Sequence, residues 1–189
     1  LNFTKGEFVN KQTTTAAIGL AINSAIAFSS PSTADDFGTG PTAAGWYADS
    51  LTHNYCMNMS YVPSWSDPMN HAMTTLNTQT KMTTSYVSLC TSNTDAQFVV
   101  STSSVMGSNT LGLINAHQKL SANVCNSATL RLNGDLLTTA TQRTKTACHE
   151  TGHSVGMIHA GTGDDCMISG YYSFTSYNDH HVSHVDYSY

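Results

Sequence analysis

Apolar residues recur at helical spacing in two early stretches of the chain. In residues 16–28 isoleucines stand at every fourth position, which predicts an amphipathic helix that ends at Ser29. A second helix is expected from Pro68, because proline is favoured in a first helical turn and Asp67 can cap it. The side chains on one stripe of this second helix are Met69, Ala72, Met73, Leu76 and Thr80.

Strand patterns occupy the middle of the chain. Over residues 127–133, Leu130 and Leu132 alternate with polar residues, as in a half-buried strand. Shorter strand-like runs cover residues 55–62, 86–90 and 97–101. Strands interspersed with two or three helices predict an α/β (α+β) fold with a mixed sheet. The 189 residues suit a single domain with a sizeable core.

The composition narrows the possible partners and the location of the protein. Charged residues make up 10% of the chain, with 12 acidic and 7 basic side chains, and no basic patch indicates a nucleic-acid partner. Ser, Thr and Asn dominate the polar positions, which favours an extracellular location. The apolar stretch at residues 16–28 is interrupted and too short to span a bilayer, so no membrane association is expected. We expect a secreted monomer that begins as a processed form.

Five cysteines fit two disulfides and one free thiol in an oxidising compartment. Cys148 immediately precedes a histidine cluster and Cys166 follows it closely, so a bridge between them would tie a helix to the next loop. The favoured pairs are Cys148–Cys166 and Cys56–Cys90, which leave the state of Cys125 open. In the alternative the thiols are additional zinc ligands, although thiolate ligands typify closed structural zinc sites.

Residues 148–159 have the spacing of a metal site. On a helix, His149 and His153 leave the same face one turn apart and can hold one ion. Gly156 can take up a backbone conformation closed to other residues, end the helix and turn the chain, so that His159 becomes a third ligand. Three neutral imidazoles leave the fourth tetrahedral position of Zn²⁺ open for water, which indicates a catalytic site.

Glu150 supplies the acid–base group of this hypothesis. It is one of only two glutamates in the chain, so its place inside the histidine cluster is not explained by general acidity. Beside His149 it cannot usefully ligate the same ion, but it can accept a proton from a zinc-activated water and pass it to a leaving amine. The sequence thus predicts a hydrolase with one catalytic Zn²⁺ and leaves calcium open.

The HExxHxxGxxH pattern that begins at His149, with a methionine eight residues after its last histidine, resembles the metzincin clan of zinc endopeptidases. The resemblance implies that Met167 forms a tight turn beneath the metal. By likeness to the matrixins, Tyr171 would line the wall of the primed-side specificity pocket. The implied fold is a mostly parallel twisted sheet with an antiparallel edge strand, an active-site helix and a terminal helix.

The same resemblance implies how the chain is divided. Residues 1–189 would form one catalytic domain, with an extension at 1–45, an N-terminal subdomain at about 46–156 and a C-terminal subdomain at 157–189. From about Trp46 onward the chain is similar to small secreted bacterial metalloproteases related to matrixins and snapalysins. A substrate would bind as an added strand along residues 127–133, if these form a sheet edge. Alternation alone also fits an interior strand.

The chain departs from these families at several positions. Ser169 stands where astacins and serralysins carry a tyrosine able to reach the metal, so no tyrosine ligand is expected. His180 and His181 stand where matrixins carry paired aspartates, whose anchoring of the N-terminus is therefore not implied. His159 replaces a snapalysin aspartate, which favours the general metzincin pattern. His180 and His184 have i, i+4 spacing, but this rival metal site lacks a nearby carboxylate and a glycine turn.

The predicted function is a secreted zinc endopeptidase that acts on proteins or peptides. One alternative is a zinc-binding adhesion or inhibitor module, against which Glu150 argues because ligation alone does not require it. Another is a zinc hydrolase of a non-peptide substrate. An elongated cleft would favour the protease, and a closed small pocket would favour this last alternative.

Overall fold

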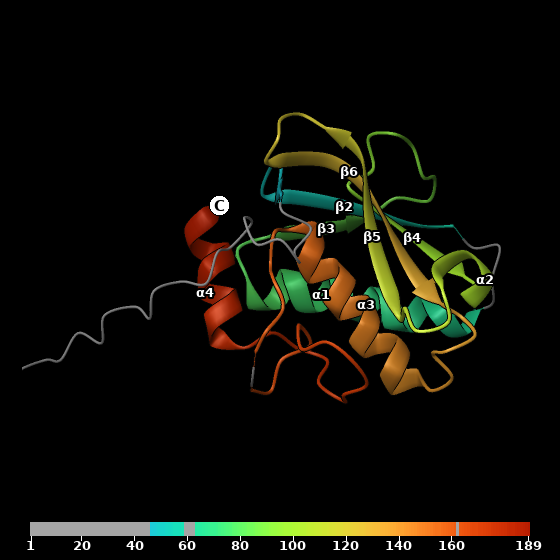
Figure 1. Cartoon of the computed structure of the whole chain (residues 1–189). Helices are drawn as coiled ribbons and strands as arrows, with labels where there is room; N and C mark the ends of the chain where they lie inside the picture. The colour runs from blue at the N-terminus through green and yellow to red at the C-terminus, as the bar shows by residue number, and fades with distance from the viewer. Residues whose placement is uncertain (1–45, 59–62, 162) are drawn as a thin grey trace, which may run out of the picture. The chain divides into compact units, whose positions relative to one another are not determined.

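A computed structural model of the protein describes residues 46–58, 63–161 and 163–189. The helix predicted over residues 16–28 lies outside them. Helices α1 (Ser66–Gln79) and α3 (Ala140–Ser154) pack against each other on one side of a single sheet (Figure 1). The mixed α/β architecture predicted from the alternation of helical and strand patterns is therefore confirmed.

A six-stranded sheet forms the framework. Its main path runs β1-β6-β4-β2-β3, and β5 pairs with β6 beside this path. The strands are β1 (Tyr47–Ala48), β2 (Thr52–Asn58), β3 (Thr83–Tyr86), β4 (Ala96–Ser101), β5 (Gly112–Lys119) and β6 (Val124–Asn133). Every pairing is parallel except that of β5 with β6. The sheet is thus mixed and mostly parallel, as predicted.

Strand β6 lies inside the sheet. Leu130 is paired with Phe98 of β4 on one side and with Ile114 of β5 on the other. The prediction that residues 127–133 form the sheet edge was therefore wrong. Alternation reports which side chains are buried and carries no information on whether another strand pairs alongside. Among the described strands β5 pairs only with β6, so the antiparallel β5 is an edge strand.

Helix α1 buries the apolar stripe expected of it, namely Met69, Ala72, Met73 and Leu76. It begins at Ser66, which puts Asp67 in the first turn, while Trp65 takes the cap position without a capping hydrogen bond. The 3₁₀ turn η1 (Pro63–Trp65) leads directly into the helix. The buried stripe packs on the sheet, whose inner face contributes Phe98, Leu130 and Leu132 to the core.

Two strand boundaries differ from the prediction. The strand expected at residues 86–90 is β3 at Thr83–Tyr86, because Val87 adds only one further backbone bond to Tyr55 and Leu89 is 72% exposed. The strand expected at residues 55–62 is β2, which begins three residues earlier, and positions 59–62 of that prediction lie outside the described residues. Exposed apolar residues such as Leu89 therefore made the predicted strand reach too far along the chain.

Both favoured disulfides are present. Cys56 is joined to Cys90, and Cys148 to Cys166, while Cys125 is a buried free cysteine. The first bridge ties β2 to the segment after β3, and the second ties α3 to the loop that follows it. No described helix is long and apolar enough to cross a membrane.

A short helix and a terminal helix complete the described part of the chain. Helix α2 (Ser103–Met106) lies between β4 and β5, and α4 (Asp179–Ser188) lies at the end of the sequence. Asn178 caps α4, since its side chain accepts a hydrogen bond from the N–H of His181. The position of α4 is fixed further by a buried carboxylate.

Asp165 connects the loop after α3 to the start of α4. Its side chain is fully buried and accepts hydrogen bonds from the N–H groups of Met167 and Asn178 and from Nδ1 of His181, the last at 2.6 Å. Burial alone would raise the pKa of Asp165, but the hydrogen bonds from these partners outweigh it and hold the pKa below its ordinary value. The ionised carboxylate is therefore the form that the fold stabilises.

Replacing Asp165 by asparagine is expected to lower the free energy of unfolding by about 3 kcal/mol, because His181 and two backbone N–H groups lose a charged acceptor. Since the folded-state pKa is depressed, this stabilisation is present above the ordinary aspartate pKa and is lost as the pH falls through the folded-state value. Urea unfolding from pH 7 to pH 3 measures both effects. Asp164→Asn, an exposed neighbour with the same change of charge, is the control. Equal losses in the two variants, or a loss for Asp165→Asn that does not shrink in acid, would contradict the assignment.

Candidate metal centre

Helix α3 places two of the predicted ligands on one face. Its N-terminus carries a capping box, in which the Thr139 side chain accepts from the N–H of Gln142 and the Gln142 side chain accepts in return from the N–H of Thr139. This cap starts the helix at Ala140 and leads it into the core, where His149 and His153 are buried in its last turns. The helical phase therefore sets both imidazoles one turn apart on the same side.

The turn after α3 brings the third histidine to the first two. The helix ends at Ser154, and Gly156 has a φ of 94°, a conformation that residues with a Cβ rarely adopt. His159 follows, and one ring nitrogen from each of His149, His153 and His159 lies within 4.8 Å of the others. Among the described residues this is the only group of three or more potential ligands that could hold one metal ion.

Backbone carbonyls fix the ring orientation of both helical histidines. Nδ1 of His149 donates to the carbonyl oxygen of Cys166 at 2.8 Å, and Nδ1 of His153 donates to that of Met157 at 2.7 Å. A proton on Nδ1 leaves Nε2 of each neutral ring as a bare lone pair. These two Nε2 atoms face each other at 3.2 Å, and lone pairs at that distance repel unless a cation lies between them.

The 3.2 Å between the Nε2 atoms of His149 and His153 fits two corners of a tetrahedral metal site. Ligand nitrogens about 2.0–2.1 Å from Zn²⁺ lie about 3.3–3.4 Å apart when they subtend a tetrahedral angle. Burial, together with the neighbouring imidazoles, lowers the pKa of His153 to about 4 and that of His149 well below its ordinary value. Neutral rings are the form that binds a metal ion. These residues therefore suit a zinc ion held by three nitrogens, with further coordination positions left for other ligands.

Met167 lies directly beneath α3. A Cβ on Gly152 would come within 2.3 Å of the Met167 sulfur, so only glycine allows this approach. A helical glycine costs about 1 kcal/mol relative to alanine, and here it lets the thioether pack between the two histidine turns. The backbone N–H of Met167 is held by Asp165. The tight turn expected at Met167 is thus packed against the helix that carries the ligands.

Glu150 is buried next to the histidines. Burial raises the pKa of its carboxyl group to about 8, although the Lys145 ammonium group works in the opposite direction. A bound dication would favour the ionised form of this carboxyl group. The side chain lies against the first residue of β5, where a Cβ on Gly112 would come within 2.1 Å of Glu150 Oε1. The edge strand therefore sets how far the carboxylate can extend.

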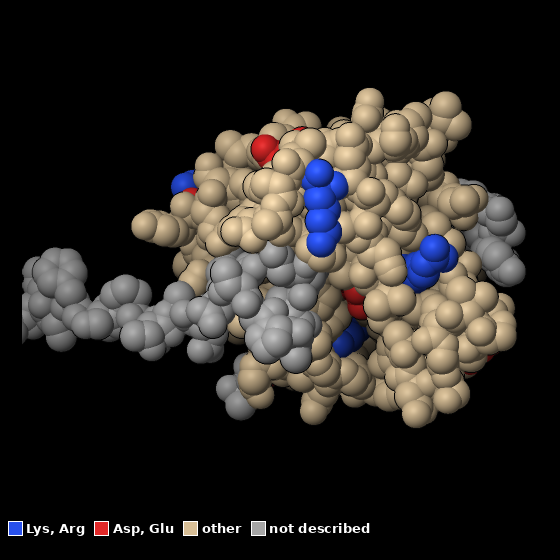
Figure 2. Space-filling model, turned by 45° about the horizontal axis from the view of Figure 1, so that its top comes forward, with Lys and Arg blue, Asp and Glu red and all other residues tan. Residues whose placement is uncertain are grey.

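A cavity of about 320 Å³ opens beside the histidines. Its walls come from the segment before β5, from α3, and from the loop after Met167. The residues that line it are Asn109, Thr110, Leu111, Gly112, Lys145, Thr146, His149, Glu150, His159, Ser169 and Gly170. Figure 2 shows a largely uncharged face with a hollow in which acidic and basic side-chain atoms are visible. The cavity thus brings together two of the three candidate ligands, the candidate base and the first residue of the edge strand β5.

Two residues of this cavity were not anticipated from the sequence. Gly112 carries no signal in the sequence, because its contact with Glu150 depends on the placement of β5. Lys145 stands four residues before His149 on the same helical face, and this spacing could have indicated it. The pocket role of Tyr171 stays a prediction: its side chain is 57% exposed, and Ser169 and Gly170 form the cavity wall in that loop.

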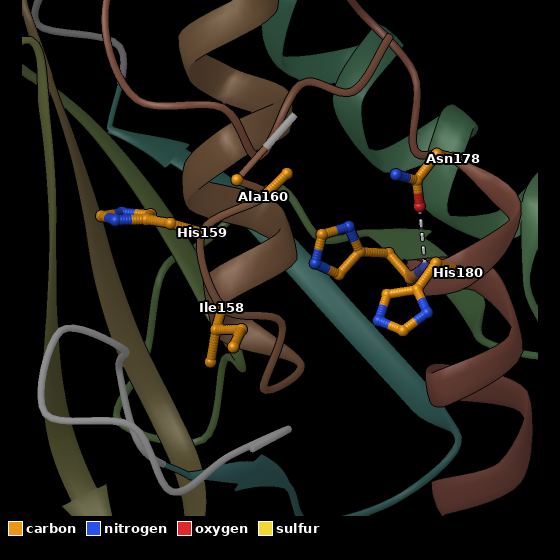
Figure 3. Close-up of a pocket in the computed structure, with 7 residues that line it drawn as sticks. Ile158, His159, Ala160, Asn178 and His180 are labelled. Carbon is orange, nitrogen blue, oxygen red and sulfur yellow. Dashed lines mark hydrogen bonds between the residues drawn. The ribbon is translucent and has the colours of Figure 1, made fainter. Parts of the chain in front are cut away.

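The C-terminal histidines do not join the three candidate ligands. His181 is buried and bonded to Asp165, whereas His180 packs edge-on against His184 with ring centroids 4.5 Å apart. Figure 3 shows the second cavity, of about 290 Å³, that lies between the turn after α3 and the start of α4. In that view the imidazole of His159 points away from His180. The His180–His184 pair is therefore separate from the three-histidine group.

No protein-family model matches this chain, and no curated protein matches it either.

Removing the Cys148–Cys166 disulfide by a double serine substitution should weaken zinc binding at least about tenfold, because the Cys166 carbonyl orients His149. Removing the Cys56–Cys90 disulfide should leave zinc affinity little changed. Each loss should lower the unfolding free energy by about 3 to 4 kcal/mol, because the effect of a bridge grows only slowly with loop length and the sequence separations are 34 and 18 residues. Zinc titration with a competing chelator, together with urea unfolding, separates the two effects. Equal weakening of zinc affinity by both double variants would contradict the proposed role of the Cys166 carbonyl.

Proposed function

We propose that this protein is a zinc-dependent endopeptidase of metzincin type that cleaves peptide bonds in proteins outside the cell. The observation that carries the proposal is the convergence of His149, His153 and His159 beside a buried glutamate, at the mouth of a cavity bordered by an edge strand. The two disulfides and the low charge of the chain fit an oxidising, extracellular location.

Edge strand β5 is the element best suited to hold an extended peptide. Among the described residues it pairs only with β6, so its other side presents backbone N–H and C=O groups. A peptide added there as a further strand would gain main-chain hydrogen bonds, and its alternate side chains would enter pockets. Gly112 is the first residue of this strand and lies against Glu150, so such a peptide would pass directly beside the histidines. This role replaces the one expected of residues 127–133.

The three histidines would hold the zinc ion through nitrogen atoms that the fold already orients. When bound, zinc would supply a Lewis acid that lowers the pKa of a water ligand toward ~7 and polarises the scissile carbonyl. Glu150 would accept the proton of the attacking water and then deliver it to the leaving amine nitrogen. Its burial limits access of bulk water to the carboxylate, and Gly112 leaves the room that the carboxylate occupies beside β5.

The other candidate functions have less support. A binding module needs the ligands alone, and a buried carboxylate with a raised pKa is costly to retain without a chemical role. A hydrolase for a small non-peptide substrate would favour an enclosed pocket, whereas this cavity is open and is lined by the first residue of the edge strand β5. Met167 beneath the helix and the mostly parallel sheet also support the metzincin resemblance.

Glu150→Gln is expected to retain one zinc ion per chain and to lower kcat/KM for peptide hydrolysis by about 100- to 10,000-fold, because the amide cannot accept the water proton. His180→Ala, which alters a histidine outside the three-histidine group, should retain both zinc and activity. Metal analysis and cleavage of a denatured protein mixture, with and without a zinc chelator, provide the measurements. Full activity in Glu150→Gln, or activity that survives removal of the metal, would refute the mechanism.

Gly112→Ala is expected to lower turnover by about 100-fold with zinc content unchanged, because the added methyl group displaces the Glu150 carboxylate. The matched control is Gly161→Ala, where a Cβ would meet no heavy atom within 4 Å. Steady-state kinetics and metal analysis of the two variants test this contact. If Gly112→Ala kept its turnover, the glycine would not be what positions the base.

A further inference from the structure

Lys145 is a buried lysine in the wall of the cavity beside the metal-binding group. It lies on α3 one turn before His149, and only 3% of its surface is exposed. Long charged side chains are rarely buried to this extent unless they are paired. Its position four residues from a candidate ligand puts it on the helical face that lines the cavity.

The ammonium group of Lys145 has few partners within the described part of the protein. Its Nζ donates to the carbonyl oxygen of Ile168, and among the described residues the only ion pair is that of Asp165 with His181. An ammonium group has three N–H donors, so one carbonyl does not satisfy it. A neutral donor could make the same bond to Ile168 without the cost of burying a charge. The bond to this carbonyl therefore does not by itself explain why a lysine is present.

Burial shifts the pKa of Lys145 but leaves its ammonium group charged at neutral pH. Loss of water lowers the pKa of Lys145 to about 8, while the negative charges of Glu150 and Asp165 oppose the shift. At neutral pH the ammonium form still predominates, and it is incompletely solvated. A carboxylate brought into the cavity would restore the interactions that burial removed.

Apart from Glu150, Leu111 and the two lining histidines, the rest of the cavity wall consists of small or uncharged polar residues. Around Lys145 stand Thr146, Ser169 and Gly170, with Thr110 and Asn109 on the facing segment. The one acidic side chain among the lining residues is Glu150, whose carboxyl group is the proposed proton carrier. The cavity therefore offers a positive charge, several hydroxyl and amide groups, and room for one side chain.

We propose that Lys145 makes this cavity a subsite for an acidic substrate side chain, so that the enzyme prefers aspartate or glutamate at one position next to the scissile bond. The inference rests on the proposed peptidase function and specifies its substrate class. Lys145 would donate charge-assisted hydrogen bonds to the substrate carboxylate, and the neighbouring hydroxyl groups would complete its solvation. The metal-binding histidines are not involved in this selection.

The test compares peptides that differ only by a carboxylate. A peptide containing one cleavage site is made with Asp, Asn, Glu or Gln at each position flanking the scissile bond, and kcat/KM is measured for each. At one position the wild-type enzyme should favour the acid over its amide by about 10- to 100-fold, as expected for a hydrogen bond to a charged group. In Lys145→Met this ratio should fall to about one, and in Lys145→Arg it should be largely restored.

An exposed lysine provides the matched control. Lys81→Met removes the same charge from a residue that lies outside the cavity, and it should preserve the wild-type ratio. A ratio of one in the wild-type enzyme, or a preference that Lys145→Met retains, would overturn the acidic subsite while leaving the peptidase proposal intact. Absence of cleavage of any peptide by the zinc-loaded wild-type chain would overturn the proposed function and the subsite with it. The wild-type ratio alone can refute the subsite, so the test does not depend on the variants folding.

Discussion

The candidate metal centre depends on two hydrogen bonds that point away from it. The Nδ1 atoms of His149 and His153 each donate to a backbone carbonyl, and this fixes which nitrogen of each ring faces the metal position. The acceptors belong to Cys166 and Met157, which both follow α3 in the chain. The ligand set is therefore only as well ordered as the segment packed beneath the helix. The Cys148–Cys166 disulfide and the Asp165 network hold that segment in place.

The sequence predicted those parts of the site that are close together along the chain. His149 and His153 follow from the helical repeat, and Gly156 explains how His159 can return to them, because each relation spans only a few residues. The edge strand could not be predicted in this way. Residues 112–119 mix Leu113 and Ile114 with small and polar residues and show no regular alternation, so the strand became evident only from its pairing with β6. The interior position of β6 was missed for the same reason.

Two glycines show why the identities of the side chains were not enough to predict the whole site. Gly152 and Gly112 carry no chemistry, yet one admits the Met167 sulfur beneath the helix and the other admits the Glu150 carboxylate beside the sheet. Both contacts join segments far apart in sequence. In each case the residue matters through the space it leaves, which becomes visible only when the partner is in place. Lys145 differs, because its helical spacing from His149 was legible in the sequence.

The contact between Gly112 and Glu150 has a mechanical consequence. The strand β5, which is suited to align a peptide, begins at Gly112, and the candidate base Glu150 lies against this residue. In the proposed mechanism, peptide binding and proton transfer would therefore both depend on the position of Gly112. A peptide that draws β5 toward itself would also change the room available to the carboxylate. In the proposed mechanism, alignment of the peptide and placement of the Glu150 carboxylate would therefore be coupled, and a ligand that distorts β5 would affect proton transfer without touching the metal.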